Sequence, residues 1–560
     1  MNQIFKLRSE QETVINEIIQ SFESGEIENI ILDAPTGSGK SIIAMYLSNY
    51  FNLKHGKKGY ILTSNLALQD QYTEDFKKFN QINFVSLKGN DNYLCDVTGT
   101  SVKNGYCNSH KITGEARKKL SCYDNCLYYN IRELAIKSPI ALLNYSYWLV
   151  QKNYVGIRHN LFPFRKRDFI IFDEAHNIDM ILHNHFLCFL DQNLDEKLKN
   201  LYEIFKKYRL DFREQYHQKD YLALRRYQDQ GEHIKKLNYL YDSFAEIREQ
   251  CNNIKTIYRL KANHKKPHLS DEIKREIEII NYFLDMLCKM EDFLDFIVDQ
   301  NKLHNIVVTK NPDSIHYSSV DTKKYFNLFL NRHCPPIRLF MSATWGNNYD
   351  LVMQSYSLDS KKTKVLHVDP KWNYESSPIF FIKNAGEMTW KNKEKSIKGN
   401  TKIVEKIIEH HSDENGLIHT VNYEVMNYLK NNLKNKRLLF YNNSKEKELV
   451  LQKFYESGGI LVGPSHFEGL NFTDEQSRFQ ILMKVPYLTL GDNFIMEKSK
   501  LNPMWYSWKT YVSMIQGIGR SIRHYNDYAI TYIVDGSFNR FFDLNEAFFS
   551  SQIKNRINII

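Results

Sequence analysis

The sequence has no long apolar run. No stretch approaches the roughly 18 uncharged apolar residues that a membrane-spanning helix needs, and the longest candidate, residues 138–150, is too short and too polar. The chain starts MNQIFKLRSE, which contains no apolar segment of the kind that a secretory signal carries. These absences predict a cytoplasmic protein that has no membrane partner.

Cysteine and proline are also scarce, with 8 and 12 among 560 residues. So few cysteines exclude a disulfide-stabilised scaffold for a chain of this length. Four of them crowd into residues 95–126, which in a reducing compartment favours metal binding over disulfides. The remaining ones are scattered, as expected of buried core cysteines: Cys188, Cys251, Cys288 and Cys334.

A strong charge imbalance is lacking as well. Lys and Arg number 75 against 65 Asp and Glu, and the net charge of +10 permits a polyanionic partner without requiring one. Apolar residues make up 42% and charged residues 25%, which excludes wholesale disorder. At about 100–200 residues per domain, the chain should hold about three or four structural units.

Short apolar strands alternate with helical patterns over most of the chain, which predicts parallel sheets covered by helices. The first set of strand patterns lies at 29–33, 59–65, 139–145, 168–176 and 337–344. The second set lies at 416–421, 437–441, 459–463, 479–485 and 529–535. Between residues 88 and 130 no period lasts, and long charged-apolar helical patterns dominate residues 180–330.

We therefore expect an α/β protein with two parallel-sheet domains. The first is interrupted by a cysteine insert and then by a mainly helical domain. The expected boundaries are 1–87, 136–179 and 335–345 for the three parts of the first α/β domain, 88–135 for the cysteine insert, 180–334 for the helical domain and 346–560 for the second α/β domain.

A glycine-rich loop, 34-APTGSGKS-41, follows one strand and opens a helix. Glycines let the backbone wrap closely around a phosphate, and the helix N-terminus adds partial positive charge. Lys40 can reach the β- and γ-phosphates of a nucleotide, and Ser41 can bind Mg²⁺. An ordinary glycine-rich turn is the alternative. The loop positions expected to hold the nucleotide are Thr36, Gly37, Ser38, Gly39, Lys40 and Ser41.

A pair of carboxylates, Asp173 and Glu174, follows the apolar residues 169–172. A buried strand that ends in two carboxylates suits a nucleotide–magnesium site, where Asp173 would bind Mg²⁺ and Glu174 would deprotonate the attacking water. Taken alone, the same residues could be a solvated helix start with Asp173 as its N-cap.

Three polar side chains near the C-terminus are spaced to share one helix face: Gln516, Arg520 and Arg523. Arginines on one face can stabilise the charge that builds on a transferring phosphoryl group. Because they lie in the second α/β domain, the site would form between the domains and close on binding. A surface helix with salt bridges is the alternative.

The clustered cysteines are Cys95, Cys107, Cys122 and Cys126, separated by 11, 14 and 3 residues. Four thiolates can hold a four-iron–four-sulfur cluster or a zinc ion, and the spacing leaves both open, although the absence of a CxxC pair leans against zinc. Basic residues and tyrosines of the same insert suit single-stranded nucleic acid, or else form solvated surface and local packing. They are Lys103, Lys111, Arg117, Lys118, Lys119, Tyr93, Tyr106, Tyr123, Tyr128 and Tyr129.

Taken in order, these motifs resemble those of the XPD/DinG family of superfamily 2 iron–sulfur helicases, nearly end to end. The matching segments are Thr63, Asn65 and Gln69, the cysteine lead-in 88–95, 342-SAT-344, 466-HFEGLNF-472 and 516-QGIGRSIR-523. The resemblance places Arg8 and Gln11 at the adenine, and Glu468 and Gly469 among the nucleotide-binding residues. The family usually has Asp where this chain has Asn471.

The resemblance implies two RecA-like domains, ATP, Mg²⁺ and a 4Fe–4S cluster as cofactors, and unwinding of DNA by a monomer moving 5′ to 3′. Single-stranded and forked DNA are the implied partners, with RNA–DNA hybrids as a further candidate. Two rival functions are open at this point. One is an ATPase that remodels protein–DNA or R-loop complexes without unwinding, and the other is a non-catalytic nucleic-acid-binding module.

Overall fold

The computed structural model describes most of the chain. The described residues are 7–77, 83–105, 107, 117–151, 164, 166–210, 229–262, 270–298, 303, 305–331, 334–368, 374–464, 472, 474–522 and 527–560. Among them, no helix is both long and apolar enough to cross a membrane.

The first α/β domain is built on a seven-stranded parallel sheet of order β12-β1-β11-β7-β2-β6-β3. Its strands are β1 (Asn29–Asp33), β2 (Gly59–Thr63), β3 (Phe84–Ser86), β6 (Ile140–Asn144), β7 (Phe169–Phe172), β11 (Ile337–Ser342) and β12 (Thr363–His367). The predicted parallel sheet is confirmed. The boundary expected at residue 345 is wrong, because β12 lies beyond it and pairs with β1 along their full length.

Both faces of this sheet are buried, as the apolar strands require. In β1, Ile30 and Leu32 pack into one core and Ile31 into the other. The first core lies beneath α1 (Ser9–Glu23) and α2 (Lys40–His55), and the second reaches α6 (Tyr145–Val150) and α7 (Ile178–Phe186). Successive side chains of a strand point to opposite faces, so one short strand anchors helices on both sides.

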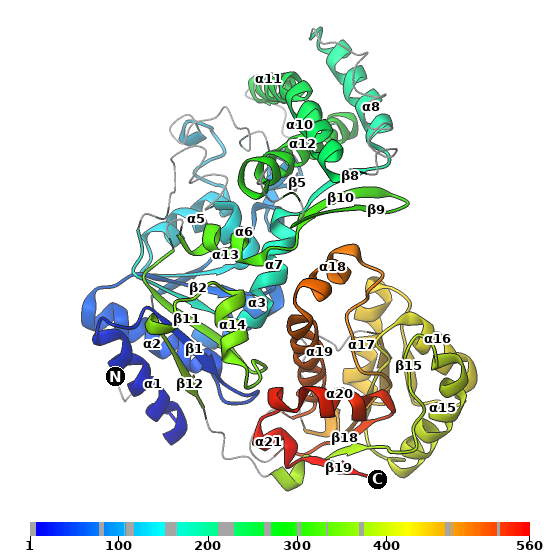
Figure 1. Cartoon of the computed structure of the whole chain (residues 1–560). Helices are drawn as coiled ribbons and strands as arrows, with labels where there is room; N and C mark the ends of the chain where they lie inside the picture. Colours follow the sequence, from blue (N-terminus) through cyan, green and yellow to red (C-terminus); the bar gives the residue numbers. More distant parts are fainter. Residues whose placement is uncertain are drawn as a thin grey trace.

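Most of the region between β7 and β11 forms a separate domain above the first sheet, while α7 and α13 (Thr322–Asn331) lie beside that sheet (Figure 1). Its helices are α8 (Leu194–Lys207), α10 (Gln230–Ser243), α11 (Ala245–Ala262) and α12 (Asp271–Asp292). It also contains an antiparallel sheet of β8 (Cys188–Asp191), β10 (Ser314–Ser319) and β9 (Ile306–Lys310). The sequence predicted a mainly helical region. These strands are short and carry His, Tyr and Ser among their apolar residues, which weakens the periodic signal.

The cysteine insert is held mostly by short elements. They are η1 (Asn90–Asn92), β4 (Leu94–Cys95), β5 (Thr100–Ser101) and η2 (Val102–Asn104), followed by α5 (Leu127–Lys137). The insert docks on α12, where Asn281 donates to the side-chain oxygen of Asn104 at 2.8 Å and Lys103 pairs with Asp285 at 3.0 Å. Polar contacts therefore join it to the helical domain.

The second α/β domain contains another seven-stranded parallel sheet, of order β15-β16-β14-β17-β18-β13-β19. Its strands are β13 (Ile379–Phe381), β14 (Gly416–His419), β15 (Leu438–Phe440), β16 (Ile460–Gly463), β17 (Phe479–Leu482), β18 (Ile530–Ile533) and β19 (Ile557–Ile559). Its helices include α15 (Lys393–His410), α16 (Tyr423–Asn432), α17 (Ser444–Ser457), α20 (Ser537–Asn545) and α21 (Ser551–Lys554).

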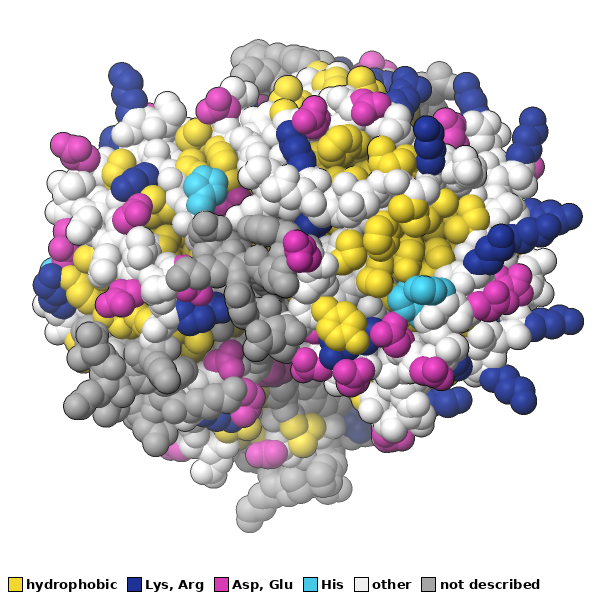
Figure 2. All heavy atoms as spheres, turned by 90° about the horizontal axis from the view of Figure 1, so that it is seen from below, with side chains coloured by type: hydrophobic (Ala, Val, Ile, Leu, Met, Phe, Trp, Pro, Cys, Tyr) yellow, Lys and Arg dark blue, Asp and Glu magenta, His cyan; other side chains and the backbone are white. Residues whose placement is uncertain are grey.

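Two helices of this domain, α18 (Asn493–Leu501) and α19 (Pro503–Ile518), lie on the side that faces the first domain (Figure 1). Seen from below, basic side chains project mainly from the edge that the second domain forms, and acidic side chains are interspersed among them (Figure 2). The mild positive charge of the chain is thus not gathered into one continuous basic track on this face.

Candidate active site between the two parallel-sheet domains

The phosphate loop joins β1 to α2 and needs glycine at two positions. Gly37 and Gly39 have φ of 79° and 81°, in the left-handed region that side chains rarely adopt. At Gly39 a Cβ atom would lie 2.3 Å from the side-chain nitrogen of Gln11, so a residue with a side chain would have to displace Gln11. Lys40 begins the helix and donates to the carbonyl of Ala34 at 3.2 Å, with its ammonium close to the loop.

Two side chains of α1 and its cap brace this loop from outside. The buried Gln11 amide donates to the carbonyl of Ser38 at 2.8 Å, and the Arg8 guanidinium donates to the carbonyl of Gly37 at 2.8 Å. Both bonds fix the loop backbone, in which the Ser38 N–H also donates to the Pro35 carbonyl at 3.0 Å. The adenine contacts expected of Arg8 and Gln11 stay a prediction.

Asp173 and Glu174 leave the end of β7, two strands away from β1 in the sheet. Asp173 is 2% exposed and accepts from the Tyr72 hydroxyl at 2.9 Å. Burial, reinforced by the neighbouring Glu174 charge, raises the pKa of the Asp173 carboxyl to about 6. Glu174 has φ of 50°, a strained backbone for a residue with a side chain, and strain of this kind gathers at functional sites.

His176 connects these carboxylates to both domains. Its Nδ1 lies 2.7 Å from the Ser342 hydroxyl and 3.3 Å from a Glu174 carboxylate oxygen, and its Nε2 lies 2.6 Å from the Gln516 amide nitrogen. Because an amide nitrogen donates, the ring accepts at Nε2 and carries its proton on Nδ1. Burial lowers the pKa of His176 to about 4, so the ring is neutral at physiological pH.

The residues that follow α19 depart from the helix expected there. The helix ends at Ile518 and Gly519 is its C-cap, so Arg520 lies in a turn, one turn beyond Gln516, rather than on a shared helix face. Gly517 and Gly519 weaken the helix at this point. A Cβ atom at Gly519 would lie 3.1 Å from the Thr36 hydroxyl, which places this turn against the phosphate loop. Arg523, Glu468, Gly469 and Asn471 lie outside the described residues.

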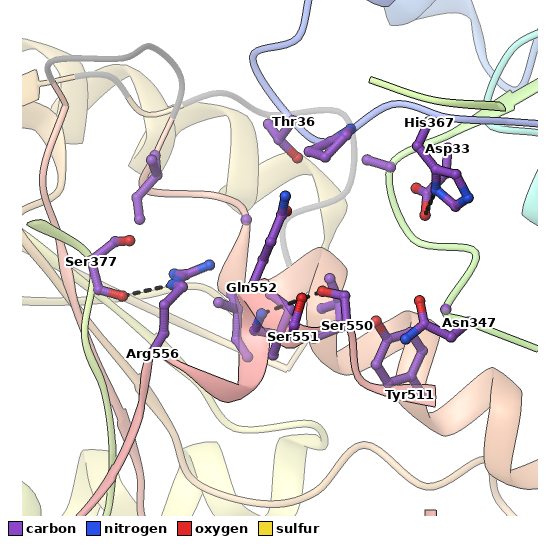
Figure 3. Close-up of a pocket in the computed structure, with 18 of the residues that line it drawn as sticks. Asp33, Thr36, Asn347, His367, Ser377, Tyr511, Ser550, Ser551, Gln552 and Arg556 are labelled. Atoms are coloured by element: carbon purple, nitrogen blue, oxygen red, sulfur yellow. Dashed lines mark hydrogen bonds and ion pairs between the residues drawn. The ribbon is translucent and has the colours of Figure 1, made fainter. Parts of the chain in front are cut away.

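A cavity of about 360 Å³ opens between the two domains beside the phosphate loop (Figure 3). Asp33 and Thr36 line it from the first domain, while Tyr511, Gln552 and Arg556 line it from the second. The domain boundary therefore offers room for a ligand next to the loop.

The four clustered cysteines lie close to one another. The point where a Cβ of Gly105 would lie is 3.3 Å from the Cys107 sulfur and 3.6 Å from the Cys95 sulfur. Burial raises the pKa of the Cys107 thiol to about 11, and the charges of Cys95, Cys122 and Cys126 act in the same direction.

No group of three or more His, Cys, Asp or Glu among the described residues is arranged to hold a single metal ion. A four-iron cluster spreads its thiolates farther apart than a zinc ion does, because each thiolate binds a different iron. Four thiols from one insert are the donor set that either group takes.

Two of the insert's tyrosines are buried in the protein, where they cannot stack on a nucleic-acid base. Tyr128 and Tyr129 are buried, and Arg117 stacks on the Tyr129 ring at 5.5 Å while donating to the Cys107 carbonyl. Local packing explains these side chains. Lys118 and Lys119 are exposed, and Tyr106 and Lys111 lie outside the described residues.

Sequence reasoning missed three residues that the site uses. Tyr72 reaches Asp173, Ser342 reaches His176, and Lys509 donates to the His176 carbonyl at 2.6 Å. Ser342 stands in the SAT segment noted in the sequence, but nothing local marks Tyr72 or Lys509, since each meets its partner across the fold.

Comparisons with known proteins agree with this geometry. The family model described as "Helicase C-terminal domain" matches residues 404–553, and "Type III restriction enzyme, res subunit" matches residues 4–212. "Probable ATP-dependent helicase MJ0942" of Methanocaldococcus jannaschii is 24% identical over 95% of this chain and 92% of its own. "ATP-dependent DNA helicase CHL1" of Scheffersomyces stipitis is 22% identical over 77% of this chain, which spans 58% of that relative.

Solved structures of XPD proteins have the same fold. One XPD helicase superposes with a TM-score of 0.62 at 15% identity, covering 99% of both chains. S. tokodaii Xpd4 superposes with a TM-score of 0.59 at 15% identity, covering 99% of this chain and 100% of its own. The helicase family model and the archaeal relative that matches along almost its whole length make this chain an ATP-hydrolysing helicase by similarity, and its two-sheet fold is the fold of the solved XPD proteins.

Proposed function

We propose that the protein is a DNA helicase that moves 5′ to 3′ along one strand and couples ATP hydrolysis to duplex unwinding. One observation carries the proposal: Gln516 of the second domain contacts His176, which lies 3.3 Å from Glu174 in the first domain. The His176 ring thus links Glu174, beside the expected nucleotide, to the second domain, so hydrolysis that moves Glu174 would also move the contact with Gln516. Relative motion of two domains is how such a site converts hydrolysis into movement.

In this proposal the phosphate loop binds the nucleotide. The loop N–H groups and Lys40 hold the β- and γ-phosphates, while Arg520 approaches from the second domain together with the predicted Arg523. Glu174 accepts the proton of the attacking water. The neutral His176 ring lies beside that carboxylate, with its Nδ1 3.3 Å from a Glu174 oxygen and hydrogen-bonded to the Ser342 hydroxyl.

Ser41 and Asp173 would hold Mg²⁺. Among the described residues, the buried Asp173 carboxyl accepts hydrogen bonds from the Tyr72 hydroxyl and the Glu174 backbone, and burial raises its pKa although the Lys40 charge acts to lower it. A divalent cation would favour its ionised form, and Mg²⁺ commonly takes one or two protein oxygens and fills its other positions with phosphate and water. Bound there, the ion supplies charge that stabilises the phosphates.

Cys95, Cys107, Cys122 and Cys126 would hold a 4Fe–4S cluster. Among the insert's described residues, the buried apolar side chains besides Cys107 are Val102, Tyr128, Tyr129 and Ala135, and a cluster would add order to the segment between them. The four free thiols of the insert supply the ligands, and the absence of a CxxC pair together with the XPD-like fold supports the cluster over a zinc ion.

DNA is the proposed partner because the curated relatives include proteins named ATP-dependent DNA helicase. Single-stranded and forked DNA are the preferred forms, RNA–DNA hybrids are a further candidate substrate, and the working unit is a monomer. A strand-tracking groove should bind with little sequence preference and with affinity that falls steeply with salt.

A strand-displacement assay on naked forked DNA tests the proposal, with ATPase activity measured in parallel with and without single-stranded DNA. The wild type should unwind 5′-tailed forks only with ATP. Lys40→Ala and Glu174→Gln should both fail to unwind, but Glu174→Gln should still bind ATP, since its amide cannot accept the proton. DNA-stimulated hydrolysis without unwinding would favour the remodelling rival, and absence of hydrolysis would favour the binding module.

A further inference from the structure

Helix α19 makes a second contact with the turn that carries Glu174 and His176. Lys509, seven residues before Gln516, donates from its ammonium to the backbone carbonyl of His176 at 2.6 Å. The same ammonium pairs with the Asp179 carboxylate at 2.5 Å. None of the motifs noted in the sequence includes Lys509 or Asp179.

The two contacts hold His176 at both ends. Lys509 and Gln516 are two helical turns apart on α19 and so share a face. Gln516 meets the imidazole ring, and Lys509 meets the backbone carbonyl. A turn held at one point can pivot about it, whereas a turn held at two points moves with the helix.

The Lys509–Asp179 pair is buried and fully bonded. Lys509 is 5% exposed and Asp179 is 1% exposed. Trp505, one turn before Lys509, donates from its indole nitrogen to the other Asp179 oxygen at 2.8 Å. Burial acts to raise the pKa of the Asp179 carboxyl, but the charges of Lys509 and of nearby Lys498 outweigh it and lower that pKa. The carboxylate is therefore ionised, and Lys509 is its bonded cation.

Stability alone gives little reason for such a pair. Replacing a buried ion pair by neutral groups of similar size is often neutral or stabilising, because desolvation offsets the attraction. Removing one partner is costly, since the other charge is then buried alone. Breaking the pair therefore destabilises the protein, although the intact pair stabilises it little compared with neutral side chains. The contact of Lys509 with the His176 carbonyl offers a separate reason for a lysine at this position.

We propose that Lys509 is a positioning residue for ATP hydrolysis. Through its bond to the His176 carbonyl, it fixes the turn that carries Glu174 against α19 of the second domain. Asp179 orients the Lys509 ammonium for this bond. The inference rests on the proposed role of Glu174 as the base. Glu174 acts only if its carboxylate lies within reach of the attacking water, and small displacements of a catalytic group are costly. Lys509 itself touches neither nucleotide nor water in this mechanism.

The decisive variant is the neutral pair Lys509→Met with Asp179→Asn. Lys509→Met alone leaves a buried carboxylate without its bonded cation and should lower both Tm and kcat. The double variant removes that unpaired charge, and the amide oxygen that Asp179→Asn introduces can still accept from the Trp505 indole. We expect its Tm to return to near the wild-type value, while kcat stays on the order of 10- to 100-fold low and the Kd for ATP is unchanged.

Lys498→Met is the matched control. Lys498 is a buried lysine of α18 at the same interface, and its ammonium lies 4.3 Å from the centre of the Trp505 ring, but it makes no hydrogen bond to the turn among the described residues. This variant should keep kcat within about twofold of the wild type, because the His176 carbonyl keeps its donor.

Two outcomes would overturn the inference. If the double variant has wild-type kcat, the Lys509–Asp179 pair has only a structural role. An equal loss of kcat in Lys498→Met would mean that any change at the interface slows hydrolysis. Both are distinct from failure of the proposed function, which would appear as a wild type without DNA-stimulated hydrolysis or a Glu174→Gln variant that hydrolyses ATP normally.

Discussion

Replacing Gly39 by alanine should weaken nucleotide binding more than it weakens the fold. The new Cβ would lie 2.3 Å from the Gln11 amide nitrogen and 3.4 Å from an Arg8 guanidinium nitrogen. Gln11 must then move, and it is the side chain whose amide holds the Ser38 carbonyl. The change therefore acts on the brace of the phosphate loop, at the residue just before Lys40.

The expected magnitude has two parts. A left-handed backbone costs a residue with a side chain about 1–2 kcal/mol. Loss of the Gln11–Ser38 hydrogen bond costs about 1 kcal/mol more. If the resulting sum of about 2–3 kcal/mol acts against the loop shape that binds phosphate, the affinity for ATP falls about 30- to 150-fold, at about 1.4 kcal/mol per tenfold.

Titration with a fluorescent ATP analogue measures this loss, and Gly56→Ala is its control. Gly56 caps the other end of the same helix with φ of 63°, and a Cβ there would meet nothing within 4 Å. Gly56→Ala should show the backbone cost as a lower Tm and leave the nucleotide Kd unchanged. If Gly39→Ala binds ATP like the wild type, or if Gly56→Ala loses as much affinity, the brace is not what shapes the loop.

Three further predictions concern the carboxylate, the cysteines and the arginine. Burial raises the pKa of Asp173 to about 6, so the protein loses stability as the pH rises from about 4 through 6 and this carboxyl ionises. Asp173→Asn should therefore raise Tm at pH 7.5 but hardly change it at pH 4. Equal Tm shifts at both pH values would contradict this. Cys122→Ser should remove the visible absorbance of anaerobically purified protein and abolish unwinding while ATPase activity and Tm largely persist, whereas stoichiometric zinc without iron in the wild type would overturn the cluster. Arg520→Ala should lower kcat by about 10²–10³-fold with little change in ATP affinity, and an unchanged kcat in a steady-state assay would remove it from the phosphoryl site.

The sequence by itself determined the α/β class, both parallel sheets and the likeness to ATP-dependent helicases. Residues 30–32 and 169–172 are unbroken apolar runs, and such short runs bounded by loop residues are typical of buried strands in a parallel sheet. The GSGKS segment between a strand and a helix needs glycine for its backbone shape, which is a local requirement. These features can be predicted from the sequence because each depends on residues that are adjacent in the chain.

Tertiary structure alone decided where the first sheet ends, where α19 stops and how the domains meet. β12 joins the first sheet by pairing with β1, more than 300 residues earlier, and nothing near residue 363 records that partner. Lys509 is the charged residue of an otherwise largely apolar helix, and the partner that its buried ammonium meets, the turn at His176, lies 333 residues away. Periodicity and turn preferences act over a few residues, whereas the partner of a buried charge depends on how whole domains pack.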